Sequence, residues 1–299
     1  LQLLDEQVAA LPTAADEVDI GPAGQVAAAW IDGSFLRGER FDINGASLGA
    51  FEVEETEDDI DLAGVDLGQS DAGFALLWRW RQIDGDIVTG QLNAQRFNDF
   101  NQPVGGEIFV RGGLGTSGSA GFFFADDGDA IEMDPIGDFA VRLAGRLGVS
   151  FQGVTTFSER IELYRFAADG SAVGDPAVIY DTPSSLDPAE LTAISSAAGA
   201  DGQVAVAWND EVEGLLGRRL LGDDAPESGP EVPLSDRSAL ESAVALASPG
   251  AAAAILSVSD ECAPGSAPCV YFRALRSGPG LIADGFEKGD LSGWCRSVP

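Results

Sequence analysis

One pattern recurs five times along this sequence: a glycine, an alternating apolar segment that often ends in tryptophan, a variable acidic stretch, an arginine with an apolar neighbour, and a turn. It is clearest in residues 24–45, where an apolar run ends at Trp30 and Arg40 precedes the turn. Repeats of about 40 to 55 residues are typical of stacked or radially arranged units. The repeat therefore limits the fold more than length or composition does.

Each copy predicts four β-strands. In the fourth copy Val204, Val206 and Trp208 alternate with alanines, which is the period of a strand. An apolar segment precedes each such strand, and another follows the turn. The preceding segments are 17–20, 64–67, 130–133, 191–194 and 243–246, and the arginines are Arg40, Arg96, Arg165, Arg219 and Arg273. Because both strand faces are apolar, we expect sheets stacked face to face.

Four-stranded sheets repeated around an axis are the blades of a β-propeller. We therefore predict an all-β fold, a β-propeller of about five four-stranded blades. Residues 112–129 break the pattern and are interpreted as an inserted hairpin, with a degenerate sixth blade as the alternative. Residues 1–280 are expected to form this single domain, in which residues 4–8 complete the last blade, and residues 281–299 form a C-terminal tail or closing strand.

Charge excludes several functions. The chain has 17 basic and 49 acidic residues, a net charge of -32, and no histidine. Such a surface repels a phosphate backbone, so no nucleic-acid partner is expected, while it attracts cations. The missing histidine excludes mechanisms that use imidazole as a base or metal ligand.

The three cysteines predict one disulfide bond. Cys262 and Cys269 flank a short Pro- and Gly-containing segment of a predicted hairpin, so a bond between them would fit the hairpin tip, and two reduced thiols are the alternative. A disulfide favours an oxidising compartment. Cys295 would then be free or would pair outside the chain.

Acidic clusters suggest a metal site. Asp126, Asp127 and Asp129, with Glu132 and Asp134 nearby, could supply oxygen ligands to Ca²⁺. Their spacing departs from the twelve-residue calcium loop, and a solvated acidic loop is the alternative. The acidic run at 54–61 has the same two interpretations. Beyond Ca²⁺, no cofactor is predicted.

No catalytic residue is predicted from the repeats. Asp32, Asp84 and Asp210 follow equivalent strands, and paired carboxylates at a channel mouth can hydrolyse glycosides. A recurring Asp more often caps a turn, however. The recurring Trp30, Trp78 and Trp208 are expected to pack between blades, whereas Trp80 and Trp294 are candidates for surface contact. The recurring arginines are expected to pair with an acidic side chain or a strand-end carbonyl.

Two features bear on export and membranes. The first five residues have neither a basic start nor a long apolar run, so they predict no signal peptide, and the missing initiator Met suggests a processed or trimmed product. The uncharged stretch 242–259 is divided by Pro249-Gly250, so it predicts two strands and no transmembrane helix.

The copies resemble repeats of bacterial secreted and surface proteins that read Gly-x-Phe-Val-Val-x-Trp followed by Arg-Phe-Asp. The resemblance covers residues 15 to 280 and is best in 25–45, while the third and fifth copies lack the Trp. Residues 283–294 resemble the Asp-Gly-Phe-Glu-x-Gly-Asp-x-x-x-Trp tails of exported Gram-negative proteins. The resemblance implies a propeller at an extracellular or cell-surface location, with a role such as adhesion and no catalytic residues.

Together these observations predict a non-enzymatic secreted or cell-surface binding module, with protein or carbohydrate as partner. One alternative is a propeller glycoside hydrolase that uses channel carboxylates. Another is a self-assembling subunit whose copies exchange terminal strands, since strand addition to an exposed sheet edge is a common mode of association.

Overall fold

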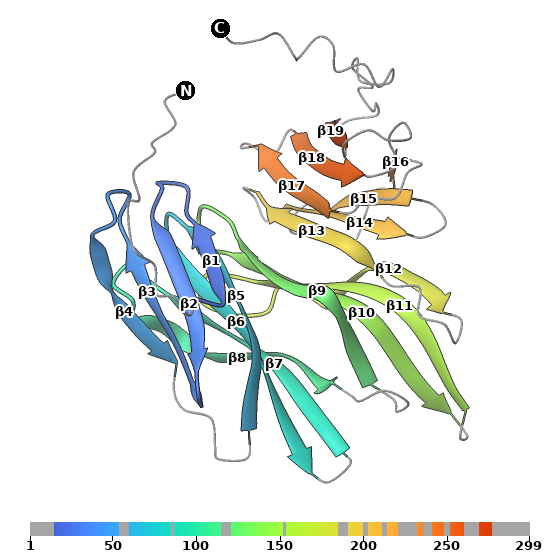
Figure 1. Ribbon diagram of the computed structural model, residues 1–299, viewed down its shortest axis with the longest axis horizontal. Helices are drawn as coiled ribbons and strands as arrows, with labels where there is room; N and C mark the ends of the chain where they lie inside the picture. The colour runs from blue at the N-terminus through green and yellow to red at the C-terminus, as the bar shows by residue number, and fades with distance from the viewer. Residues whose placement is uncertain are drawn as a thin grey trace, which may run out of the picture.

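The computed structural model is all-β (Figure 1). It describes residues 15–53, 60–84, 87–114, 121–151, 154–184, 191–199, 203–210, 214–220, 232–235, 241–247, 252–259 and 269–276. These residues form strands and connections, and no helix occurs among them. Accordingly, the described part of the chain has no helix long and apolar enough to cross a membrane.

The strands follow one another as antiparallel meanders in four hydrogen-bonded sheets. The first sheet contains β1 (Glu17–Ile20), β2 (Val26–Asp32), β3 (Phe35–Phe41) and β4 (Ser47–Val53). The second contains β5 (Ile60–Ser70), β6 (Gly73–Asp84), β7 (Ile87–Phe97), β8 (Pro103–Leu114), β9 (Gly121–Met133), β10 (Phe139–Phe151), β11 (Val154–Phe166) and β12 (Ala177–Ser184). The third contains β13 (Thr192–Ala198), β14 (Val204–Asp210), β15 (Gly214–Leu220) and β16 (Val232–Ser235), and the last contains β17 (Glu241–Ala247), β18 (Ala252–Ser259) and β19 (Cys269–Arg276).

The eight-stranded sheet is two meanders, β5–β8 and β9–β12, joined by a single parallel pair between Leu114 and Phe122. We refer to β1–β4, β5–β8, β9–β12 and β13–β16 as the first to fourth blades. The three strands β17–β19 follow them. The predicted count of about five blades therefore corresponds to four hydrogen-bonded sheets, because the eight-stranded sheet contains two meanders. Residues 112–114 and 121–129, predicted to lie in an inserted hairpin, instead extend β8 and β9.

The blades radiate from an axis. The first strand of each meander contacts the first strand of the next, from β1 to β5, β9, β13 and β17. These strands therefore lie innermost, and the later strands of each meander lie farther out (Figure 1). The predicted β-propeller architecture is confirmed.

The hydrophobic core lies between the blades. Phe51 of the first blade packs on Phe74 of the second, with 4.7 Å between ring centroids, and Phe74 stacks on Phe97 at 4.8 Å. Further clusters fill the spaces between the second and third blades and between the third and fourth. Trp78 and Trp208 are buried in these layers, which confirms their predicted packing role, whereas Trp30 and Trp80 are only partly buried.

A five-residue turn recurs at one face of the propeller. In residues 42–46 the amide of the first residue bonds the carbonyl of the fifth, and the amide of Gly45 bonds the carbonyl of the first. The same two bonds form in residues 21–25, 98–102, 134–138 and 167–171. The fourth position has positive φ and is Gly in four turns and Asn101, at φ 58°, in the other. We call the surface formed by these turns the turn face.

Candidate functional site

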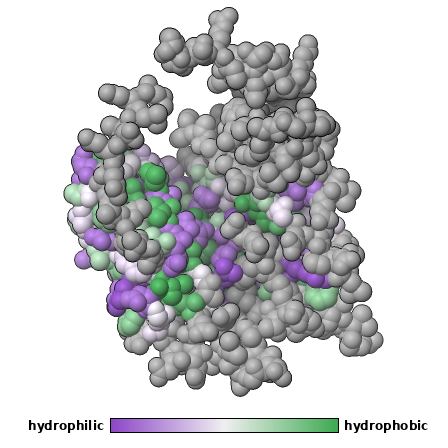
Figure 2. All heavy atoms as spheres, viewed as in Figure 1, coloured by the Kyte–Doolittle hydropathy of each residue, from purple (hydrophilic) through white to green (hydrophobic). Residues whose placement is uncertain are grey.

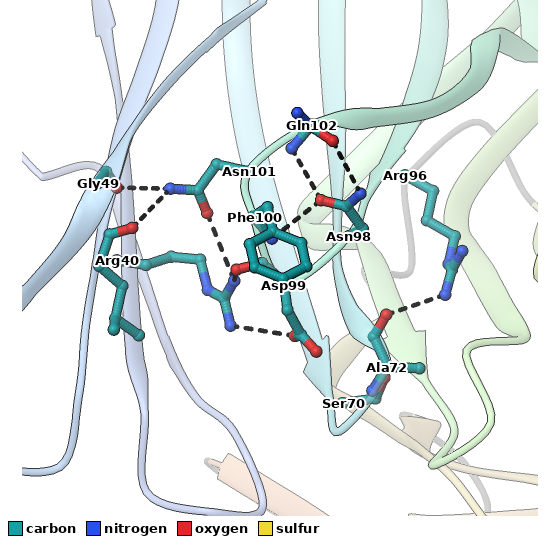
Figure 3. A network of polar contacts seen from close by, with 11 residues as sticks. Arg40, Gly49, Ser70, Ala72, Arg96, Asn98, Asp99, Phe100, Asn101 and Gln102 are labelled. Carbon is teal, nitrogen blue, oxygen red and sulfur yellow. Dashed lines mark hydrogen bonds and ion pairs between the residues drawn. The ribbon is translucent and has the colours of Figure 1, made fainter.

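Two of the recurring arginines, Arg40 and Arg96, lie where neighbouring blades meet (Figure 3). Arg40, at the end of β3, donates to the carbonyl of Asp99 in the second blade, whereas Arg96, at the end of β7, donates at 3.0 Å to the carbonyl of Ala72 in its own blade. Arg96 also lies against the 134–138 turn of the third blade, since a Cβ on Gly137 would come within 2.4 Å of its guanidinium. The predicted pairing with an acidic side chain is confirmed for Arg40, which forms an ion pair with Asp99 at 3.6 Å. The carbonyls that Arg40 and Arg96 reach lie in turns rather than at strand ends.

Arg165 occupies the equivalent position in the third blade but faces a pocket between the third and fourth blades, which we call the inter-blade pocket. The structure shows no hydrogen bond or ion pair between the Arg165 guanidinium and another described residue. The pocket is lined by the polar residues Asp134, Asp138, Arg165 and Gln203 and by the apolar residues Phe139, Ala140, Phe166, Val173, Ala198 and Val204.

Asp134 is a buried carboxylate at the edge of this pocket, with 1% of its surface exposed. Its Oδ1 accepts the amides of Ile136 at 3.0 Å and Asp138 at 2.9 Å, which shapes the 134–138 turn. Its Oδ2 is buried and has no hydrogen-bond partner among the described residues. Burial raises the pKa of Asp134 above its ordinary value, although the backbone hydrogen bond from Ile136 opposes the shift.

The remaining walls combine apolar and hydrogen-bonding groups. Phe139 and Phe166 stack with 5.0 Å between ring centroids and are almost fully buried. Asp138 is fixed by the amide of Ala168, which donates to its Oδ1 at 2.7 Å. A guanidinium, two carboxyl groups and an amide beside an aromatic wall form the mixed lining of small-ligand sites.

A second polar feature lies on the innermost strands. Asp19 of β1 accepts the amide of Gln69 of β5 at 2.8 Å, and Asp66 of β5 accepts the amide of Ile131 of β9 at 3.1 Å. Glu132 of β9 continues this series. Each of these three carboxyl groups accepts a hydrogen bond from the first strand of the next blade, and we call them the axial carboxylates.

Enclosure by the blades changes the acidity of the axial carboxylates. Burial raises the pKa of Glu132 to about 7, partly opposed by Arg142 and by Ser196, which donates to Glu132 at 3.2 Å. Burial also raises the pKa of Asp66, with repulsion from Glu17 adding to the shift, and that of Asp19. The sequence shows this series as an acid after Val18, Val65 and Ile131 in the first strands.

The carboxylates singled out from the sequence have other surroundings. Asp32 pairs with Arg37 of the same hairpin, and Asp210 accepts a hydrogen bond from Tyr180 of the preceding blade. Asp84 is the last residue of β6 and pairs with Ile87 of β7, and the structure does not describe its side chain. Among the described side chains, the contacts of Asp32 and Asp210 are therefore with different partners in different blades.

The calcium and disulfide predictions concern residues that are only partly described. Asp126 and Asp127 lie on β9, and the structure does not describe their side chains. Asp129 forms an ion pair with Arg79 at 3.2 Å. Among the described side chains no group of three potential ligands converges. Cys269 begins β19 and Cys262 lies outside the described residues. The calcium site and the disulfide both stay predictions.

Comparison with known proteins gives no family assignment. No family model matches the chain, and no curated protein is similar to it in sequence. Among solved structures, the GH93 α-L-arabinofuranosidase of Fusarium graminearum is 13% identical at a TM-score of 0.42, with 89% of this chain and 75% of that one covered. The BP39L lectin of Burkholderia pseudomallei is 16% identical at 0.39, covering 89% and 82%. The Aleuria aurantia lectin, complexed with Fucα1-6GlcNAc, is 13% identical at 0.38, covering 90% and 78%. Similarity at this level assigns neither a ligand nor a catalytic residue to this chain.

Proposed function

We propose that this chain is a non-enzymatic binding module that holds a carbohydrate in the inter-blade pocket. The observation that carries the proposal is the position of Arg165. Its equivalents Arg40 and Arg96 reach protein carbonyls, whereas Arg165 faces the pocket beside the buried carboxyl of Asp134. A charged donor that lines a small pocket and has no acceptor among the described residues is a group that a polar ligand can satisfy.

The lining favours a sugar over an apolar ligand. Arg165 can donate two parallel hydrogen bonds to vicinal hydroxyls or to a sugar carboxylate. Asp138 and Gln203 can accept from or donate to further hydroxyls. The buried rings of Phe139 and Phe166 supply apolar surface for the C–H groups of the sugar.

The test is ligand-detected NMR with a panel of neutral monosaccharides and their uronic acids, applied to wild type, Arg165→Gln and Arg165→Lys. We expect Arg165→Gln to abolish binding and Arg165→Lys to weaken it, because Lys keeps the charge but loses the paired donors. Arg37→Gln, which alters a half-exposed ion pair with Glu52 at 2.9 Å, is the matched control and should bind like wild type. Equal binding by Arg165→Gln and Arg37→Gln, or no binding by wild type, would refute the proposal.

We infer that the module acts outside the cell or at the surface of a bacterium. The repeat and the terminal segment 283–294 resemble those of exported bacterial proteins, and a net charge of -32 suits a salty exterior. Cell fractionation and surface proteolysis test the location. Thiol titration of the denatured protein tests the disulfide: one reactive thiol supports a Cys262–Cys269 bond, whereas three exclude it.

A glycoside hydrolase is the second candidate, and Glu132 is the observation that favours it. A carboxyl with a pKa of about 7 carries a proton near neutrality, as the acid of a glycosidase must. Release of nitrophenol from aryl glycosides by wild type, abolished in Glu132→Gln, would support hydrolysis, and no release across a sugar panel would exclude it for those substrates.

A further inference from the structure

Large apolar side chains are exposed on the turn face of the first two blades. Phe100 has 81% of its surface exposed, and Ile20, Ile43 and Leu48 are also exposed. Figure 2 shows hydrophobic residues interspersed among hydrophilic ones over the N-terminal part of the molecule. We call these four residues the turn-face patch. Turn tips usually carry small or polar residues, so a group of large apolar side chains there indicates an interaction surface.

Protein contacts hold the members of the patch close together. Ile43 lies against the 21–25 turn that follows Ile20, because a Cβ on Gly24 would meet its Cδ1 at 2.9 Å. The side-chain amide of Asn101, next to Phe100, donates to the carbonyl of Leu48 at 3.3 Å. The patch therefore continues from the first blade onto the second.

The patch is also preformed. The 42–46 turn is fixed by Asp42, whose Oδ1 accepts the amides of Asn44 and Ala46. The 98–102 turn is fixed in the same way by Asn98, which accepts the amides of Phe100 and Gln102. A partner that docks here does not have to order these turns, so less conformational entropy is lost on binding.

Negative charge surrounds the patch. Asp71 and Asp99 are exposed on the same face. The backbone hydrogen bond from Ala46 lowers the pKa of Asp42, so this carboxylate is ionised near neutrality. Beneath them Arg40 is buried and forms an ion pair with Asp99 at 3.6 Å, and Arg96 is buried and donates to a protein carbonyl, so neither arginine exposes its charge. The exposed charge beside the apolar side chains is therefore acidic.

We propose that the turn-face patch docks a cationic protein segment in which apolar side chains alternate with Lys or Arg. Charge complementarity selects this partner, because a second copy of the chain would bring a further net charge of -32 to the interface, and anionic lipid or nucleic acid would also be repelled. This binding is independent of the inter-blade pocket, which lies between the third and fourth blades.

The experiment uses a fluorescent peptide of alternating Leu and Lys and its Leu–Glu counterpart as probes, with binding followed by anisotropy. Ile43→Ser/Phe100→Ser removes the centre of the patch, and Val149→Ser/Val178→Ser removes exposed apolar side chains elsewhere. We expect the Leu–Lys peptide to bind wild type and the control double variant alike, and the patch variant at least about tenfold more weakly. Added salt should weaken binding, and the Leu–Glu peptide should not bind.

A charge variant covers the case in which the patch variant is destabilised. Asp71→Lys leaves the apolar side chains in place and should also weaken binding of the Leu–Lys peptide. Equal affinity of all variants for that peptide, or its failure to bind wild type, would overturn the proposal. So would a wild-type dimer in sedimentation that Ile43→Ser/Phe100→Ser dissociates, because a second copy would then cover the patch.

Discussion

Arg40 of the first blade donates a hydrogen bond to the main-chain carbonyl of Asp99 in the second blade, over 3.2 Å. Its side chain is 2% exposed and its guanidinium lies 5.1 Å from the ring centre of Phe74, also in the second blade. One side chain therefore joins a polar and an aromatic contact across the boundary between two sheets. Contacts of this kind hold blades together where no backbone ladder crosses.

Replacing Arg40 should weaken that boundary. We expect Arg40→Ala to lower the free energy of unfolding by about 2–3 kcal/mol, because it leaves a cavity over Phe74 and removes the donor of a partly buried hydrogen bond. Urea unfolding followed by tryptophan fluorescence measures the change. Arg37→Ala removes a more exposed ion pair and should change it by less than about 1 kcal/mol. Similar losses in the two variants would contradict this role of Arg40.

Substitutions of Asn101 can distinguish its effect on the 98–102 turn from that of its hydrogen bonds to the first blade. Its amide donates to the carbonyl of Gly49 at 2.8 Å and its Oδ1 accepts from Arg40 at 3.4 Å, while its φ of 58° suits Gly or Asn. Asn101→Gly keeps the backbone conformation, so its expected loss of about 1–2 kcal/mol comes from the lost side-chain hydrogen bonds and the greater backbone entropy of Gly in the unfolded chain. Asn101→Ala should lose about 1 kcal/mol more through backbone strain. Thermal melting of the pair tests both terms, and equal melting temperatures would contradict the strain.

The repeat predicts the architecture because strand period and turn residues are local properties of the chain. The positions of β1, β5, β9, β13 and β17 agree with the predicted first strands. The joining of two meanders was not predicted, since it depends on the end of β8 meeting the start of β9 at Leu114 and Phe122. Such a contact between elongated strands has no sequence pattern.

The candidate site was less predictable for a physical reason. The axial carboxylates follow an apolar residue at equivalent positions of the first strands, but 49 acidic residues hide a series of three. The inter-blade pocket is formed by the 134–138 turn, the end of β11 and the start of β14, which are far apart in sequence. The pocket is distinguished by the surroundings of Arg165, which differ from those of Arg40 and Arg96. The three arginines occupy the same position of the repeat, so the sequence pattern does not show this difference.

At Gly38 of β3 the ring of Phe51 lies close against the backbone of the first blade. A Cβ there would lie 2.0 Å from Cζ of Phe51 and 2.5 Å from the carbonyl oxygen of Ala28. We therefore expect Gly38→Ala to destabilise the protein by about 1–3 kcal/mol through overpacking. Gly106→Ala is the matched control, because no atom lies within 4 Å of its added Cβ, and it should melt within a few degrees of wild type. Equal stability of the two variants would show that Phe51 moves aside freely.

The last prediction concerns Glu132 and pH. Its folded pKa of about 7 lies above the ordinary value of 4.5, so between these values the folded state holds a proton that the unfolded state has released. The contribution of Glu132 to stability is therefore complete below pH 4.5 and is lost as pH rises toward 7. Glu132→Gln stays neutral at every pH and keeps an acceptor for Ser196, so its stability should fall less than that of wild type over this range.

Unfolding free energies measured by urea titration from pH 4 to 8 test this difference in slope. Asp42→Asn provides the opposite sign, because the pKa of Asp42 is lowered by the backbone amide of Ala46. Its contribution is present above the ordinary value of 3.8 and is lost only as pH falls below it. Asp42→Asn should therefore leave the slope between pH 4.5 and 7 unchanged. A wild-type slope that Glu132→Gln does not reduce would mean that other groups, Asp66 first among them, carry the protons that the axial carboxylates take up.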